Sequence, residues 1–427
     1  MGETFSWICG ILAVLASQPA SAASPDFKLA YVLATASYCA YAVGSIDSDG
    51  EKLKDQGHQR AFNCLEAAVR ADPTGLAALN VQPPDVEAYF SPVTPQNAYL
   101  MIHAKNGVIL AFRGTLTPPI SPGQAQRDGL IKEATQTFKA AVLIAFKNYL
   151  GDWANNFKAA ANERNRHAGY DNSWQELKEH LKIECGPGAV AACSKFRSFA
   201  AAMGADQQLF LTGHSKGGAL ATLSALDVPE LFERAPQTTV YTFAAPKSLS
   251  KEGAANAATA TADLWRFEDE RDVVPTLPPD STASLDLRLL KLTPYAHVGR
   301  RALFQGNEKP ELFPQPANGV DPPGDLRRLK AILIGGAEPA ANDFIEATDL
   351  LDRFLSASAD GCRRFVDTHF SVFSAVQEMT QTSEAQPGPG GDEEAAKRNF
   401  FFSGVSNAEG EILWGYGQWC SLLYPPR

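Results

Sequence analysis

The sequence has no excess of positive charge, which excludes one large class of partners. Its 427 residues include 38 Lys and Arg against 48 Asp and Glu, for a formal net charge of −10. A protein that binds the phosphate backbone of nucleic acids needs clustered basic residues, and electrostatic attachment to an anionic membrane needs them too. We therefore expect no nucleic-acid partner and no charge-driven membrane docking.

Long apolar runs are also missing. The run nearest the start, Ile8 to Ala16, is about half as long as a membrane helix requires, so we expect no integral membrane span. Followed by Ala20-Ser21-Ala22, it is typical of a signal-peptide core and cleavage site, although no Lys or Arg precedes it. Residues 1–22 are predicted to be a signal peptide of a secreted or periplasmic protein; the alternative is a buried first helix of a cytoplasmic one.

Cysteines are few. Removing residues 1–22 would leave an even set, namely Cys39, Cys64, Cys185, Cys193, Cys362 and Cys420. In an exported chain this predicts three disulfides whose pairing stays open, with Cys185 and Cys193 the easiest to join across a short loop. Buried free thiols in a reducing compartment are the alternative. No C-x-x-C pair is present, so we expect no zinc site, no thioredoxin-type chemistry and no cofactor.

The overall composition is that of a folded chain. Apolar residues make up 45% and charged residues 20%, which excludes wholesale disorder, and Gly and Pro are present in ordinary amounts. The length would allow two or three domains, but no clean linker divides the chain. We interpret 23–427 as one α/β domain with insertions at about 116–151, 301–360 and 384–398.

Periodicity gives the expected element order. Helical spacing of apolar residues predicts an amphipathic first helix over 26–43 and further helices over 130–150, 173–182, 195–203 and 217–226. Strands are expected at 99–103 and 107–112, joined by a turn at Lys105-Asn106-Gly107, and at 207–212, 238–244 and 263–267. This alternation predicts a mainly parallel sheet covered by helices.

The most informative motif is Gly213-His214-Ser215-Lys216-Gly217, a G-x-S-x-G between a predicted strand and a predicted helix. A serine on so tight a turn has strained backbone angles, and the flanking glycines relieve the crowding. The turn would raise the Ser215 hydroxyl above the sheet edge, near a helix N-terminus that favours a developing anion. Ser215 is therefore the predicted nucleophile.

A serine nucleophile needs a histidine base, and the histidine needs an acid that orients it. In the chain order Ser, acid, His, only His297 and His369 remain as bases. The strand over 263–267 ends in an acidic cluster, of which residues 268–270 are compatible with simple solvated charges. Asp272 is followed at once by Val273-Val274 and a proline turn, so we expect it to point inward.

An ordered set of motifs then carries a family resemblance. The segments are Ser37-Tyr38-Cys39, Phe112-Arg113-Gly114-Thr115, Asp152-Trp153, His167-Ala168-Gly169-Tyr170, Gly213 to Ala219, Thr242-Phe243-Ala244-Ala245-Pro246 and Arg271 to Pro279, with a last match near 369. Together they resemble the fungal-type, or class 3, lipases of the α/β-hydrolase fold.

The resemblance implies further roles. The histidine of Asp367-Thr368-His369 is similar to the family's catalytic one, on a loop opening the last helix, whereas His297 is similar to a histidine that is not the base. The backbone N–H groups of Thr115 and Lys216 would form the oxyanion hole. Lys216 replaces the family's usual apolar residue, which puts a cation beside the acyl site that could alter substrate choice.

The family's short lid corresponds here to the much longer interval 116–152, which contains Phe138 and Phe146. A stretch this apolar either covers an apolar substrate cleft or packs as an additional part of the hydrophobic core. Trp153 is a candidate lid anchor, or simply a half-buried aromatic residue.

The resulting prediction is a secreted carboxylic-ester hydrolase, specifically a triacylglycerol lipase that works through an acyl-enzyme on Ser215 and contacts a lipid interface transiently. Phospholipase A1 or an effector-type phospholipase is the second enzyme reading, and cleavage of feruloyl or other soluble esters is the third. A catalytically silent lipase-like scaffold that binds a partner is the non-enzyme alternative.

Overall fold

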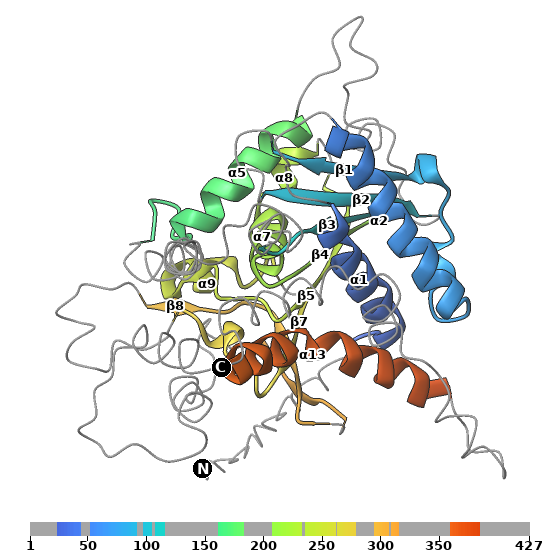
Figure 1. Cartoon of the computed structure of the whole chain (residues 1–427). Helices are drawn as coiled ribbons and strands as arrows, with labels where there is room; N and C mark the ends of the chain where they lie inside the picture. The colour runs from blue at the N-terminus through green and yellow to red at the C-terminus, as the bar shows by residue number, and fades with distance from the viewer. Residues whose placement is uncertain are drawn as a thin grey trace, which may run out of the picture.

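The computed structural model describes residues 24–43, 52–91, 97–104, 107–115, 161–182, 207–232, 235–261, 263–278, 294–306, 309–315 and 359–384. Several predictions fall outside these ranges: the signal peptide, the turn at 105–106, the helices over 130–150 and 195–203, Phe138, Phe146, Trp153, Cys185, Cys193 and Cys420. Figure 1 shows the arrangement of the described elements.

Within the described ranges, eight strands form one sheet in the order β1-β2-β3-β4-β5-β7-β9-β10. They are β1 (Val86–Phe90), β2 (Ala98–Ala104), β3 (Gly107–Phe112), β4 (Gln208–His214), β5 (Gln237–Phe243), β7 (Leu264–Asp269), β9 (Arg300–Phe304) and β10 (Glu311–Phe313). The run from β3 to β9 is parallel, while β1, β2 and β10 pair antiparallel at the edges. The mainly parallel α/β fold predicted from the sequence is confirmed.

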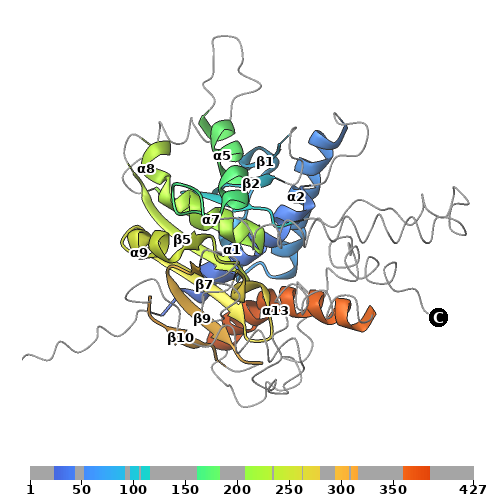
Figure 2. The ribbon, with the colours of Figure 1, turned by 90° about the vertical axis from the view of Figure 1, so that its left-hand side faces the viewer.

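Helices cover both faces of this sheet (Figure 1, Figure 2). On one face lie α1 (Phe27–Cys39), α2 (Lys52–Ala71) and α13 (Ala359–Glu384). The other face carries α5 (Ala168–Lys182), α7 (Lys216–Leu226), α8 (Val228–Leu231) and α9 (Lys251–Ala257). A small second sheet pairs β6 (Leu249–Ser250) with β8 (Tyr295–Ala296). Short 3₁₀ turns span Ala40–Ala42, Ala77–Leu79, Pro83–Asp85 and Val274–Thr276.

Strand side chains alternate between the two helical layers, as the pleat of a strand requires. In β2, Leu100 and Ile102 belong to the core under α1, whereas Tyr99 and Met101 belong to the core under α7. Strand β3, which is buried between the two layers along its whole length, is accordingly apolar on both faces.

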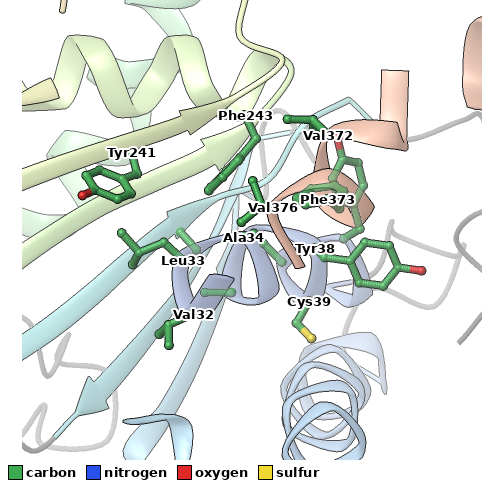
Figure 3. Close-up of a cluster of buried hydrophobic side chains, with 14 of the residues drawn as sticks. Val32, Leu33, Ala34, Tyr38, Cys39, Tyr241, Phe243, Val372, Phe373 and Val376 are labelled. Atoms are coloured by element: carbon green, nitrogen blue, oxygen red, sulfur yellow. The ribbon is translucent and has the colours of Figure 1, made fainter. Parts of the chain in front are cut away.

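The first helix differs from its prediction. Residues 30 to 41 are buried on every side of the helix, because α2, α13 and the sheet all pack against α1. Figure 3 shows side chains of β5 and α13 meeting those of α1; the labelled ones include Phe243, Phe373, Val376, Leu33, Ala34 and Tyr38. The helix is a central core element and not the amphipathic helix that its spacing predicted.

A disulfide joins Cys39 at the end of α1 to Cys64 in α2, across a sequence separation of 25 residues. Both cysteines are buried. The bond fixes the end of α1, and with it the 3₁₀ turn Ala40–Ala42 that follows.

A buried carboxylate ties α5 to the far end of α7. Asp227 accepts hydrogen bonds from Arg166 Nη2 at 2.5 Å, Lys178 Nζ at 2.7 Å and Trp174 Nε1 at 2.8 Å. Burial by itself would raise the pKa of Asp227, but the bonds from the two cations and the indole outweigh it and hold this pKa well below its usual range. The carboxylate is therefore ionised inside the protein, where its charge balances the buried cations.

Candidate active site

Ser215 occupies the turn between β4 and α7. Its backbone angles are φ 56° and ψ −131°, in the left-handed half of the map that a residue with a side chain rarely adopts. Its N–H donates to the carbonyl of Phe243 at 3.0 Å, and its own carbonyl accepts from the N–H of Gly218 at 2.9 Å. Such strain persists where the surroundings over-determine it, and it concentrates at functional sites.

The motif glycines allow α7 to approach the sheet. A Cβ on Gly217 would lie 2.0 Å from the carbonyl oxygen of Phe112, and a Cβ on Gly213 would lie 2.3 Å from the backbone of Gly217. Real side chains are not found at such distances. The helix that begins at Lys216 can therefore start directly above β3 and β4 only because these positions carry hydrogen.

The predicted acid and one predicted base meet at the same end of the sheet. His369 Nδ1 donates to Asp272 Oδ2 at 2.8 Å, and Asp272 Oδ1 accepts from the Val274 N–H at 2.9 Å. Both side chains are buried. A histidine that donates from Nδ1 to a carboxylate has its lone pair on Nε2, the tautomer that a general base needs.

His297 has a different set of partners. Its Nε2 donates to the carbonyl of Pro275 at 2.7 Å and lies 3.9 Å from a carboxylate oxygen of Glu268. Of the two histidines that the sequence offered, the structure brings His369 to Asp272.

The position of His369 corrects one expectation. The residue lies well inside α13, and not on a loop that opens the helix. Apolar residues that face the core continue on both sides of it, with Val366 before and Phe370, Phe373 and Val376 after. This spacing keeps the backbone helical through His369.

The acidic cluster at residues 268–270 also differs from its expectation, which was that these charges are solvated. Glu268 and Asp269 are each only 2% exposed and are not solvated, whereas Glu270 is exposed. Glu268 accepts from Arg266 at 2.6 Å, and Asp269 accepts from Arg271 and from the Ser371 hydroxyl, both at 2.7 Å. Burial would raise the pKa of Asp269, but these hydrogen bonds lower it more. Asp269 thus forms a second contact between β7 and α13.

The two predicted oxyanion donors lie just beyond the carboxyl ends of two neighbouring strands, β3 and β4. Parallel pairing sets Phe112 of β3 opposite Gly213 of β4, so Thr115 and Lys216 both follow closely after neighbouring strands. A Cβ on Gly114 would lie 2.9 Å from the carbonyl oxygen of His214, which shows how near the two turns are.

The Lys216 side chain extends to the start of β2. Its Nζ donates to Asn97 Oδ1 at 2.7 Å, and Asn97 Nδ2 donates to Glu176 Oε2 of α5 at 2.6 Å. The ammonium that the sequence put beside the acyl site is thus engaged by Asn97.

Two residues that the sequence reasoning did not single out lie beside this centre. His214 precedes the predicted nucleophile, and its Nε2 donates to the backbone carbonyl of His369 at 2.8 Å, while the Tyr41 hydroxyl donates to its Nδ1 at 2.8 Å. Burial above all, and then the nearby His369, lower the pKa of His214 well below its usual value. The motif position of His214 was a signal for it; Tyr41 had none beyond its closeness to Tyr38.

The described ranges hold neither a candidate metal site nor a candidate membrane span. Those ranges hold no group of three or more His, Cys, Asp or Glu side chains suited to a metal ion. Nor does any helix within them combine the length and the apolar character needed to cross a bilayer.

No curated protein matches the chain in sequence. Among solved structures, a triacylglyceride lipase of Rhizomucor miehei is 14% identical, with a TM-score of 0.42, over 77% of this chain and 94% of that one. A lipase of Rhizopus microsporus var. chinensis is 15% identical, with a TM-score of 0.40, over 70% and 82%. Residues 147–282 match the family described as lipase (class 3), and the resemblance to that family drawn from the sequence motifs is confirmed.

Proposed function

We propose that the protein is a serine hydrolase of carboxylic esters, and specifically a triacylglycerol lipase. The observation that carries the proposal is the 2.8 Å hydrogen bond between His369 and Asp272, formed beside the strained turn of Ser215. The family match over residues 147–282 supports a lipase independently of this geometry.

In the proposed reaction, Ser215 Oγ attacks the ester carbonyl carbon while His369 Nε2 takes its proton. Asp272 keeps the imidazole in the correct tautomer and stabilises the imidazolium. The negative charge on the carbonyl oxygen is stabilised by the backbone N–H groups of Thr115 and Lys216. The tetrahedral intermediate collapses, the alcohol leaves with the proton from His369, and the acyl group stays on Ser215. Water, deprotonated by His369, then attacks the acyl carbon, the bond to Ser215 Oγ breaks, and His369 returns the proton to Ser215 Oγ as the fatty acid leaves.

The substrate proposal is a water-poor acyl ester at a lipid interface. It rests on the family match and on the apolar segment 116–151, which would act as a lid with Phe138, Phe146 and Trp153 against the acyl chain. Opening of such a lid would expose apolar surface to lipid and account for transient contact with the interface.

We further propose that residues 1–22 are removed on export and that 23–427 form one hydrolase domain with insertions. The Cys39–Cys64 disulfide supports this, because disulfides persist mainly in oxidising compartments.

The test is an activity panel of emulsified triacylglycerol, phospholipid and a short soluble ester, with labelling by a fluorophosphonate probe. Ser215→Ala should lose labelling and lower kcat by about 10⁴-fold or more. Ser224→Ala, at a buried serine of α7, is the matched control and should keep both. Turnover retained by Ser215→Ala would refute the mechanism, and preference for phospholipid would replace the substrate class.

The two histidines give a second test. His369→Ala should lower kcat by orders of magnitude, while His297→Ala should leave most of it. A larger loss at His297 would overturn the assignment of the base.

A further inference from the structure

The contacts of His214 connect the turn after α1, the nucleophile turn and α13. The Tyr41 hydroxyl donates to His214 Nδ1, and His214 Nε2 donates to the main-chain carbonyl of His369, each at 2.8 Å. We propose that Tyr41 and His214 are positioning residues, which fix the catalytic imidazole by holding the backbone of the residue that carries it. This inference rests on the proposed function, in which His369 is the base.

The bond from His214 acts on His369 itself. His369 is held through its ring by Asp272 and through its carbonyl by His214, so both ends of the residue are fixed relative to Ser215. A base within a helix can move only with that helix, because its backbone is part of the helical hydrogen-bond ladder. Fixing the carbonyl of His369 therefore fixes the register of α13 against β4.

Packing around His214 restrains the ring itself. Its centroid lies 4.4 Å from that of His369, 4.7 Å from that of Phe370 and 4.8 Å from that of Phe373. The side chain is fully buried. An imidazole surrounded in this way has one orientation, and both of its nitrogens are used by the contacts described.

Its protonation state suits the role. A ring that accepts at Nδ1 and donates at Nε2 is neutral, and the lowered pKa of His214 keeps it neutral at physiological pH. His214 thus adds no charge when His369 becomes an imidazolium during the reaction.

Tyr41 supports the opposite side of the site as well. A Cβ on Gly114 would lie 1.9 Å from the Tyr41 hydroxyl oxygen, so the hydroxyl rests directly against the turn that leads to Thr115. The buried guanidinium of Arg113 donates to the carbonyl of Val43, just beyond Tyr41. The short segment 41–43 therefore contacts both the support of the base and the turn of the oxyanion hole.

The experiment compares variants that keep or remove the two hydrogen bonds, with kcat and KM measured on a short soluble ester. His214→Leu should lower kcat about 10- to 100-fold with little change in KM, because small misplacements of a catalytic group reduce the rate by such factors. His214→Gln, which keeps one donor and one acceptor, should recover most of the loss. Tyr41→Phe should lower kcat about 5- to 10-fold, and combined with His214→Leu it should add little, since both belong to one chain of contacts.

Tyr31→Phe is the matched control. The Tyr31 hydroxyl accepts from Gln377 Nε2 at 3.1 Å and is hydrogen-bonded to Asp72, so this change removes contacts of α1 with α13 and with the residue that follows α2. Gln377 lies about two helical turns beyond His369 in α13. Tyr31→Phe should leave kcat within about twofold, although it destabilises the fold comparably. Thermal unfolding by circular dichroism records that comparison for every variant.

Three results would overturn the inference: unchanged kcat in Tyr41→Phe and His214→Leu, equal losses in His214→Gln and His214→Leu, or an equal loss in Tyr31→Phe. Wild-type protein that neither hydrolyses esters nor reacts with a fluorophosphonate would instead refute the proposed function. If His214→Leu does not fold, the comparison of Tyr41→Phe with Tyr31→Phe decides the question.

Discussion

Asp227→Asn offers a sharp test of the electrostatics of this fold. The change keeps the shape of the side chain, removes its charge and replaces one acceptor oxygen by an NH2 donor that faces N–H donors. Arg166 and Lys178, both buried, would then lose the charged partner that they share, while the contacts of Arg166 to Asp171 and of Lys178 to Glu230 would remain. Removing one partner of a buried ion pair destabilises a protein by about 3–5 kcal/mol, and we expect a loss in this range at pH 7.

The pH dependence of that loss follows from the depressed pKa of Asp227. A carboxyl whose pKa is lower in the folded state stabilises the protein at pH values above its unfolded pKa, about 3.9. This contribution disappears as the pH falls through the folded value. The difference between wild type and Asp227→Asn should therefore be constant from pH 8 to pH 5. Below about pH 4 it should shrink by up to about 1.4 kcal/mol per pH unit.

The measurement is urea-induced unfolding followed by far-ultraviolet circular dichroism at pH 7, 5, 4 and 3. Asp263→Asn is the control, because Asp263 is exposed at the start of β7, and its loss should stay within about 0.5 kcal/mol. Asp227 lies at the end of α7 opposite to Ser215, so ester hydrolysis by the folded variant should be retained. A loss below about 1 kcal/mol at pH 7, or a difference that does not shrink in acid, would refute the reasoning.

Three further changes test separate contacts. Cys64→Ser opens the disulfide to Cys39 and should lower the free energy of unfolding, measured with urea, by about 3.5 kcal/mol on the loop-entropy model. A reductant should then lower the stability of wild type more than that of the variant, and equal effects on the two would contradict this role of the disulfide. Gly217→Ala places a methyl group against the carbonyl of Phe112 and should lower the free energy of unfolding by about 1–3 kcal/mol or prevent folding. An unchanged melting temperature would contradict the close packing. Ser371→Ala removes a hydroxyl that donates to the buried carboxylate of Asp269. It should lower the free energy of unfolding by about 1.5–3 kcal/mol in the same assay, and a change below about 0.5 kcal/mol would contradict that contact.

The parts of the fold that could be predicted are those where local pattern and final environment agree. β3 is a continuous apolar run, β4 and β5 combine apolar residues with threonines, and each strand ends in a recognisable turn, so the pattern predicts both their type and their order. The nucleophile turn was predictable for the same reason, because Gly213 and Gly217 satisfy a local steric requirement.

What escaped prediction depends on pairing between distant residues. β9 begins with Arg300 and Arg301, which look like surface residues until Trp265 and Phe313 are found beneath their guanidinium groups. The burial of Glu268 likewise needs Arg266 beside it. Tyr41 packs against Phe370 of α13, which is more than 300 residues away in the sequence. No spacing of residues near the first helix predicts that contact.

The packing of α1 against α13 has a consequence for synthesis. The first helix of the domain has one of its main partners almost at the other end of the chain, and that partner also carries His369. While the ribosome has yet to complete α13, the nascent polypeptide would expose an apolar helix to chaperones and would have no imidazole next to Asp272. Under the proposed function, ester hydrolysis would therefore begin only after α13 has packed against α1 and the sheet.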